Sequence, residues 1–137
     1  MAQSESPVRV KEVMTSKVRV AEPDEPLDSI RQILTEERCH HIPVVDDGLP
    51  VGMISSRDLV HAARRHGPEQ LAVEFESGGT ARDIMKTHLE TIGPDAPIDE
   101  AIERIGAGRI HALIVVDGAG RLVGIVTHRD LLAHLLG

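Results

Sequence analysis

Short apolar runs along the chain predict buried strands. Continuous runs at 42–45 (IPVV) and 112–116 (ALIVV) are typical of strands covered on both faces. Each is followed by a turn and by a second apolar run, which ends in VGMI or VGIV. Shorter runs at Val18–Val20 and Leu89–Ile92 predict one further strand ahead of each pair.

Apolar residues spaced three and four apart predict four helices, each with one buried face. The first helix of each half starts near a proline, Pro26 or Pro97, which suits the first helical position. The residues expected to face inward on these helices are Leu27, Ile30 and Leu34, then Ile98, Ala101, Ile102 and Ile105. On the second helix of each half they are Leu59, Val60 and Ala63, then Leu131, Leu132, Leu135 and Leu136.

The two halves of the chain are copies of one unit. Val10–Ile30 aligns with Ala81–Ala101, so that Met14 matches Met85, 71 residues later. The offset becomes 72 after the turn between the paired strands, because this turn is one residue longer in the second copy. A hairpin turn tolerates such a change well. The sequence therefore predicts an α/β (α+β) fold with the order β-α-β-β-α, repeated once.

This duplication divides the chain into three parts. The first repeat covers residues 8–66, and the second covers 80–137. The connector at 67–79 is punctuated by a Gly-Pro pair and a Gly-Gly pair, and it has room for a short helix of its own.

One heptapeptide occurs in both copies, as GMISSRD at Gly52–Asp58 and as GIVTHRD at Gly124–Asp130. A hydroxyl residue followed three positions later by an acid fits a helix capping box, which would make the motif purely structural. The usual acid in that box is Glu or Gln, however, and both copies use Asp. Both copies also place glycine three residues before the hydroxyl, where a missing side chain lets another group approach the backbone.

The same heptapeptide also fits a nucleotide site. A helix N-terminus favours an anion, and the hydroxyls of Ser55 and Thr127 and the cations Arg57 and Arg129 would add to that preference. An ionised aspartate only accepts hydrogen bonds, so it suits the vicinal hydroxyls of a ribose. The two interpretations, cap and nucleotide site, both remain open from the residues alone.

The chain resembles a tandem pair of CBS domains, named after cystathionine β-synthase and often called a Bateman module. The resemblance covers 8–136 and is carried by the duplicated order of elements, the IPVVDD-G hairpin and the G-h-h-[ST]-x-x-D phrase. It implies that the repeats pack about a pseudo-twofold axis and leave clefts for adenine-bearing ligands such as AMP, ADP, ATP or S-adenosylmethionine. It further implies a disc-like homodimer and a regulatory role toward a partner protein.

The resemblance, together with the two arginines at the helix starts, assigns twelve residues to nucleotide binding. Ribose contact falls to Asp58 and Asp130, and phosphate contact falls to Ser55 and Thr127. The base would lie near Met14, Met85 and the stretches Cys39–Ile42 and Ile110–Leu113. The full set is Met14, His40, Ile42, Ser55, Arg57, Asp58, Met85, His111, Leu113, Thr127, Arg129 and Asp130. Ile114 stands where the first copy has Pro43, which predicts unequal affinities.

Composition narrows the function further. The net charge is −7, with 22 acidic and 15 basic residues, so neither nucleic acid nor an anionic membrane is expected as the main partner. The N-terminus shows no signal peptide, and no apolar run is long enough to span a membrane, so we expect a cytoplasmic protein. The single cysteine, Cys39, excludes an internal disulfide and is expected to be an inert thiol.

No arrangement in the sequence indicates catalysis. A nucleophile triad, paired catalytic carboxylates and metal-ligand spacing are all missing from the sequence, so no enzyme activity, catalytic cofactor or metal site is expected. The adjacent His40 and His41 would point to opposite faces of a strand. The sequence therefore predicts a sensor of an adenine nucleotide or adenosyl compound. The alternative is a dimerisation or interaction module whose clefts are vestigial.

Overall fold

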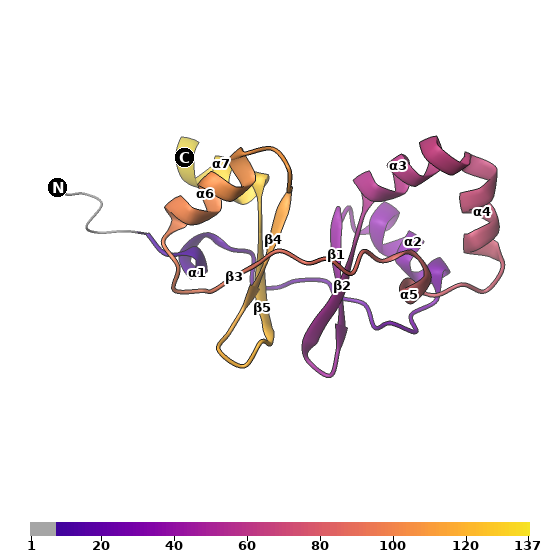
Figure 1. Ribbon diagram of the computed structural model, residues 1–137, viewed down its shortest axis with the longest axis horizontal. Coiled ribbons are helices and arrows are strands. Elements are labelled where there is room, and N and C mark those ends of the chain that lie inside the picture. The colour runs from indigo at the N-terminus through magenta and orange to yellow at the C-terminus, as the bar shows by residue number, and fades with distance from the viewer. Residues whose placement is uncertain (1–7) are drawn as a thin grey trace. The chain divides into compact units, whose positions relative to one another are not determined.

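The computed structural model describes residues 8–137 as a mixed α+β fold of short helices and two small sheets (Figure 1). The polar segment 1–7, which entered the prediction that no signal peptide is present, lies outside these residues. The chain forms two compact units. Among the described residues, one unit combines 8–18 with Leu89–Gly137, and the other is Arg19–His88.

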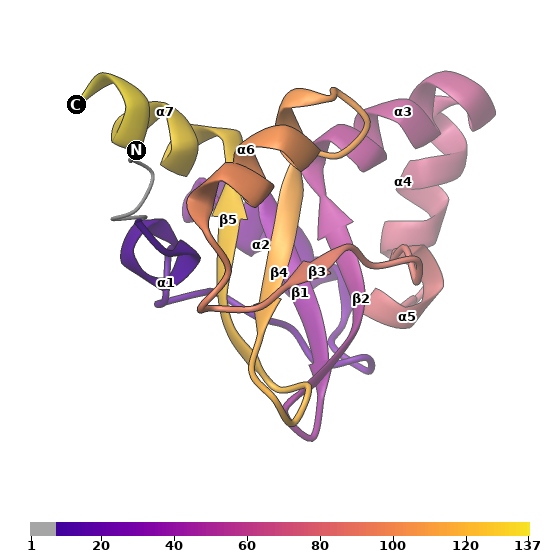
Figure 2. The same ribbon diagram turned by 60° about the vertical axis from the view of Figure 1, so that its left-hand side comes forward.

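The Arg19–His88 unit is built on an antiparallel hairpin. Its strands are β1 (His41–Asp46) and β2 (Leu49–Ser55), and its helices are α2 (Leu27–Glu36), α3 (Ser56–His66), α4 (Pro68–Glu76) and α5 (Ala81–Ile84). These helices lie to one side of the hairpin (Figure 1). Figure 2 shows the chain turning sharply between α3 and α4, at Gly67, whose φ of 94° favours glycine. Helix α4 confirms that the connector holds a helix.

The second unit has a three-stranded sheet in the order β3-β4-β5, with β3 parallel and β5 antiparallel to β4. Its strands are β3 (Thr91–Ile92), β4 (Ala112–Val116) and β5 (Leu122–Thr127), and its helices are α1 (Val10–Val13), α6 (Ile98–Gly106) and α7 (His128–Leu136). All three helices lie to one side of this sheet (Figure 1).

The two hairpin turns differ as predicted. Asp47 and Gly48 connect β1 to β2, and both have positive φ, as a type I′ turn requires. The turn from β4 to β5 is closed by Asp117, whose backbone N–H donates to Arg121 O at 2.9 Å. Gly120, which lies between Asp117 and Arg121, also has a positive φ.

The first strand of each repeat is shorter than predicted. The run Leu89–Ile92 forms a strand only at Thr91–Ile92. The prediction of a strand at Val18–Val20 is wrong, because the chain there makes a single parallel bridge, between Ala21 and Val44.

Pro43 explains why the first copy lacks this strand. In the second copy, Ile114 N–H donates to Glu90 O at 3.0 Å, which supports the pairing of β3 with β4. The matching residue in the first copy is Pro43, and proline has no N–H to donate. The ladder therefore loses one bond and shrinks to a bridge.

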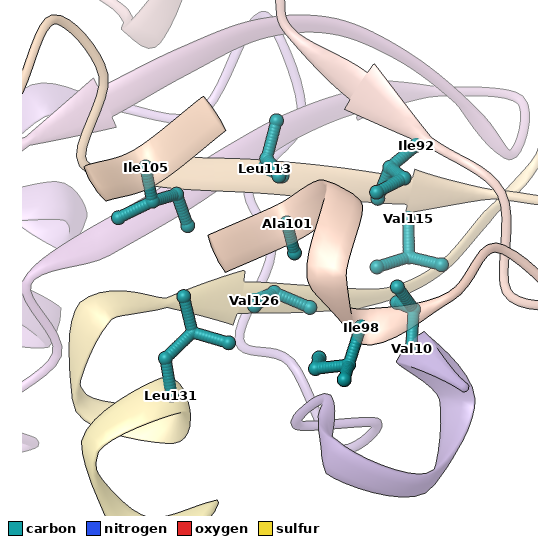
Figure 3. Packing of buried hydrophobic residues seen from close by; sticks show 9 residues of the cluster. All are labelled: Val10, Ile92, Ile98, Ala101, Ile105, Leu113, Val115, Val126 and Leu131. Carbon is teal, nitrogen blue, oxygen red and sulfur yellow. The ribbon is translucent and has the colours of Figure 1, made fainter. Parts of the chain in front are cut away.

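Each unit has its own apolar core. Figure 3 shows the core of the unit with the three-stranded sheet, where Ile98, Ala101 and Ile105 of α6 face the strands. The other core is formed around α2, β1 and β2. Its buried members are Ala21, Leu27, Ile30, Ile33, Ile42, Val44, Ile54 and Ala81. The predicted inner faces of α2 and α6 are thus confirmed in the main, except that Leu34 and Ile102 are only partly buried and that Ile33, which was not predicted, is fully buried.

The predicted inner faces of α3 and α7 are partly wrong. Val60 of α3 is 70% exposed, and α7 buries Leu131 but leaves three leucines exposed. These are Leu132, Leu135 and Leu136. The helical side chains in the core of each unit come mainly from α2 or α6. The helices α3 and α7 therefore contribute only a narrow stripe of side chains. Pro26 and Pro97 also stand one residue before their helices, as N-caps, instead of at the first helical position.

The repeats in sequence and the units in space are different divisions of the chain. The start of the first repeat, with α1, belongs to the unit that holds most of the second repeat, and α5 does the reverse. Val10 N–H donates to Ala96 O, and the matching Ala81 N–H donates to Glu25 O, both at 2.9 Å. The ion pairs Lys11–Asp95 and Arg82–Asp24 also match at the offset of 71. The two copies therefore exchange their first segments through the same contacts.

Candidate functional site

The first candidate site lies at the N-terminus of α3. Ser55 is buried and is the N-cap, and its Oγ accepts a hydrogen bond from Asp58 N–H at 3.0 Å. The carboxylate of Asp58 does not serve the cap. Its Oδ1 lies 3.0 Å from Nζ of Lys86, with the Asp58 side chain 25% exposed. A negative charge here is favoured by the helix dipole.

The matching site at the N-terminus of α7 is arranged differently. Asp130 Oδ2 accepts from Thr127 N–H at 2.9 Å and from Thr127 Oγ1 at 3.2 Å. Its other oxygen, Oδ1, accepts from Thr15 Oγ1 at 2.9 Å. Asp130 therefore reaches back to its own N-cap, as the capping-box interpretation predicts, and it uses both oxygens on protein donors.

Thr15 and Lys86 are partners of the two aspartates that the sequence analysis missed. They occupy the same place in the two repeats, 71 residues apart, and each immediately follows a repeated methionine. Each comes from the exchanged segment and contacts the aspartate of the other repeat. Each candidate site is therefore built from both repeats within one unit. The alignment of the repeats pairs Thr15 with Lys86. It does not show that the segments carrying these residues are exchanged between the repeats.

The repeated glycines are docking points for the repeated methionines. A Cβ on Gly124 would stand 2.5 Å from Sδ of Met14 and 3.0 Å from Thr15 O. A Cβ on Gly52 would meet the side chain of Met85 in the same way. Both contacts confirm that a missing side chain lets another group approach the backbone. Met14 and Met85 are half-buried and pack against the cores, and they hold the segments that carry Thr15 and Lys86.

A pocket of about 560 Å³ opens beside Asp58. It is lined by Ile54, Asp58, Leu59, Ala62, His66, Gln70, Leu71, Asp83 and Ile84. These residues come from β2, α3, α4 and α5, so the connector helix forms one wall. The volume falls within the range of about 300–1,000 Å³ that small-molecule sites occupy. Asp58 is the one predicted site residue among the described residues that line it.

The other predicted site residues are placed unevenly. Arg57 and Arg129 are exposed in the first turns of their helices, and His40 is exposed just before β1, with Nδ1 3.4 Å from Ser56 Oγ. His111 is half-buried in the matching position before β4. Ile42 and Leu113 have no exposed surface and belong to the two cores, so contact with a base would fall to their main chains.

The thiol of Cys39 fits the expectation of low reactivity. Partial burial, with the Glu37 carboxylate nearby, raises the pKa of Cys39 above its ordinary value, against a smaller opposing effect of Arg19. A raised pKa lowers the thiolate fraction at neutral pH, and the thiolate is the nucleophile.

Among the residues whose side chains the structure describes (8–73, 75 and 77–137), no three His, Cys, Asp or Glu side chains gather closely enough to hold a metal ion. Within the same range, no helix is both long and apolar enough to cross a membrane.

Known proteins resemble this chain over nearly its full length. A CBS domain-containing protein of Dictyostelium discoideum is 34% identical over 133 residues, which cover 94% of this chain and 92% of that protein. Inosine-5′-monophosphate dehydrogenase of Thermoplasma acidophilum is 30% identical over 92% of this chain. The match covers 23% of that enzyme and likewise 23% of a homoserine O-acetyltransferase of Methanococcoides burtonii, so the chain spans about a quarter of these longer relatives.

The fold of this chain also resembles that of a solved structure. The CBS domain pair of protein MJ0100, crystallised with 5′-methylthioadenosine and S-adenosyl-L-methionine, superposes with a TM-score of 0.76 at 26% identity. The superposition covers 94% of this chain and 96% of that one. The family model for the CBS domain matches residues 10–65 and 81–137. The chain therefore belongs to the CBS domain family, of which it carries two copies.

Proposed function

We propose that this chain is a regulatory module that binds an adenosine-containing ligand and signals its presence to a partner protein, without catalysis of its own. The observation that carries the proposal is the environment of the Asp58 carboxylate. Its carboxylate is partly exposed beside a pocket of ligand size, and it is paired with the exposed side chain of Lys86 instead of with its own helix. Such a carboxylate is able to accept the two hydroxyls of a ribose.

The solved relative supports the same class of ligand. 5′-Methylthioadenosine and S-adenosylmethionine, both named with that CBS pair, share the adenosine group and differ in what the 5′ position carries. The ribose hydroxyls are common to this class, so a contact between Asp58 and the ribose does not by itself select among the 5′ groups. We place the ligand at the N-terminus of α3, with Ser55 and Arg57 beside it and His40 near the base. The equivalent position at α7 uses Thr127, Arg129, Asp130 and His111.

The absorbance spectrum of the purified protein tests the proposal directly. The chain has no Trp or Tyr and a single Phe, so its own near-ultraviolet absorbance is weak and a bound adenine is easy to detect. We expect either an adenine band, identified by acid extraction and mass spectrometry, or thermal stabilisation by AMP, 5′-methylthioadenosine or S-adenosylmethionine. A ligand at about 100 times its Kd adds about 2.7 kcal/mol. A blank spectrum with no thermal shift for any of the three would refute the proposal.

The exposed apolar stripe on α7 favours a second role, as the contact of a homodimer. Leu132, Leu135 and Leu136 follow helical spacing, so they share one face, and their exposure ranges from 49% to 82%. Apolar side chains gathered in this way mark protein–protein contacts more often than scattered ones do. We propose that this stripe joins two copies of the chain, whether or not its ligand sites are occupied.

Charged substitutions on this stripe should therefore change the oligomeric state. We expect the double substitution Leu132→Asp and Leu135→Asp to convert a dimer into a monomer in sedimentation or light-scattering measurements, because two buried charges would have no partners. The control is His134→Asp on the same helix, which lies on the opposite side at about 100° per residue. A double variant that remains dimeric, or a wild-type protein that is monomeric at high concentration, would exclude this contact.

A further inference from the structure

We infer that Thr15 and Lys86 give the two sites different preferences for the charge of an adenosyl ligand. The Asp58 site, with Lys86, takes ligands that carry a 5′-phosphate, and the Asp130 site, with Thr15, takes uncharged or cationic ones. The inference rests on the proposed function, because it assumes that both aspartates face adenosyl ligands.

The backbone holds these two residues in the same way. Lys86 N–H donates to Met53 O and Met53 N–H donates to Lys86 O, both at 2.9 Å. Thr15 and Ile125 exchange the same two bonds, also at 2.9 Å. Because the main chains are equivalent, the difference between the sites at this position comes from the side chains alone.

Lys86 brings a positive charge that is available to a ligand. Its ammonium has three N–H donors, and one is directed at Asp58 Oδ1, 3.0 Å away. The side chain is 66% exposed, so its other donors remain accessible. A phosphate on a ribose held by Asp58 would lie within reach of the flexible lysine, and a charge-assisted hydrogen bond is among the stronger kinds.

Thr15 provides only a neutral hydroxyl at the matching place. It donates that hydroxyl to Asp130 Oδ1, so the carboxylate keeps its full negative charge beside the ligand position. This charge repels a phosphate and attracts a cation such as a sulfonium. Arg57 and Arg129 match each other and are both exposed, so they do not distinguish the two sites.

A structural role for Lys86 does not explain its position well. Its ion pair with Asp58 is largely exposed on the lysine side, and exposed ion pairs contribute little to stability. A threonine or another hydroxyl residue would hold the segment equally well, as Thr15 shows at the matching bridge. The fold therefore does not require a cation at this position.

Calorimetric titration of the full chain with AMP and with 5′-methylthioadenosine tests the inference. We expect Lys86→Thr to weaken AMP binding about tenfold, the change carried by one hydrogen bond to a charged group, and to leave 5′-methylthioadenosine nearly unchanged. The converse substitution, Thr15→Lys, should strengthen AMP binding at the other site. The selectivity due to Lys86 should also shrink at high salt, because screening weakens charge interactions.

The matched control is Lys17→Thr, the same substitution at an exposed lysine two residues after Thr15. It should leave both affinities unchanged. The inference is wrong if Lys86→Thr weakens the binding of both ligands by the same factor, or if Lys17→Thr weakens AMP binding as much as Lys86→Thr does. In either case Lys86 does not bind the phosphate. If neither ligand binds the wild-type protein, the proposed function itself fails, which is a distinct result from a parallel shift.

Discussion

Asp58→Ala is expected to weaken adenosyl-ligand binding at its site by about ten- to hundredfold, since hydrogen bonds to a charged acceptor are worth about 1.5–3 kcal/mol. The fold should be almost unaffected. Ser55 Oγ still accepts from the backbone N–H of residue 58, so the cap of α3 survives. The lost ion pair with Lys86 is largely solvent-exposed on the lysine side. Titration calorimetry and thermal unfolding of the same sample measure both effects.

The identical substitution at Asp130 is the matched comparison, and it should lower stability in addition to weakening ligand binding at its own site. Asp130→Ala removes the acceptor of Thr127 N–H and of the Thr15 hydroxyl, at a cost of about 1.5–3 kcal/mol for hydrogen bonds to a charged group, while Thr127 Oγ1 still accepts from the backbone N–H of residue 130. For a chain of this size, that cost lowers Tm by several degrees. If Asp58→Ala destabilises as much as Asp130→Ala and binding is unchanged, both aspartates are caps and the ribose contact is misplaced.

Gly124→Ala is expected to destabilise the protein by about 1–3 kcal/mol, the usual cost of overpacking. The added Cβ would stand 2.5 Å from Sδ of Met14 and 3.0 Å from the carbonyl oxygen of Thr15. The sulfur is able to move, but the carbonyl belongs to the bridge between Thr15 and Ile125, so the backbone must shift as well. Denaturant unfolding followed by circular dichroism measures the loss.

A double-mutant cycle with Met14→Ala tests whether the clash has this cause. The pair should be less destabilised than the sum of the single variants, with a coupling energy in the range of about 0.5–3 kcal/mol. Gly118→Ala is the control, because nothing lies within 4 Å of its added Cβ. Additive effects in the cycle would mean that Met14 does not dock on Gly124, and the exchange of first segments would lose its main support.

Most of the fold could be predicted from one sequence because it is duplicated. Two copies of the same apolar pattern located the paired strands, the hairpin turns and the helices α2, α3, α6 and α7, but not the short helices α1 and α5. The errors have local causes that a pattern does not reveal. Pro43 removed the N–H that a strand at Val18–Val20 needed, and α7 exposes leucines that a period of 3.6 residues assigned to the core.

The site was predictable only in part. The heptapeptide identified Ser55, Asp58, Thr127 and Asp130 as a matched set, and it left open whether each acid caps its helix or faces a ligand. The structure separates them, since Asp130 returns to the backbone of Thr127 while Asp58 pairs with Lys86. Both arrangements suit the same local sequence pattern, so no spacing rule distinguishes them.

The sequence by itself determined the repeat, the order of the helices and paired strands from α2 to α3 and from α6 to α7, the family to which the repeats belong and the residue types at the starts of these helices. Only the tertiary structure decided which segment docks on which repeat, and therefore that Thr15 faces Asp130 and Lys86 faces Asp58. The physical reason is that local propensities and periods depend on neighbours along the chain. The docking of Met14 on Gly124 and of Met85 on Gly52 depends on packing between residues that the sequence places far apart.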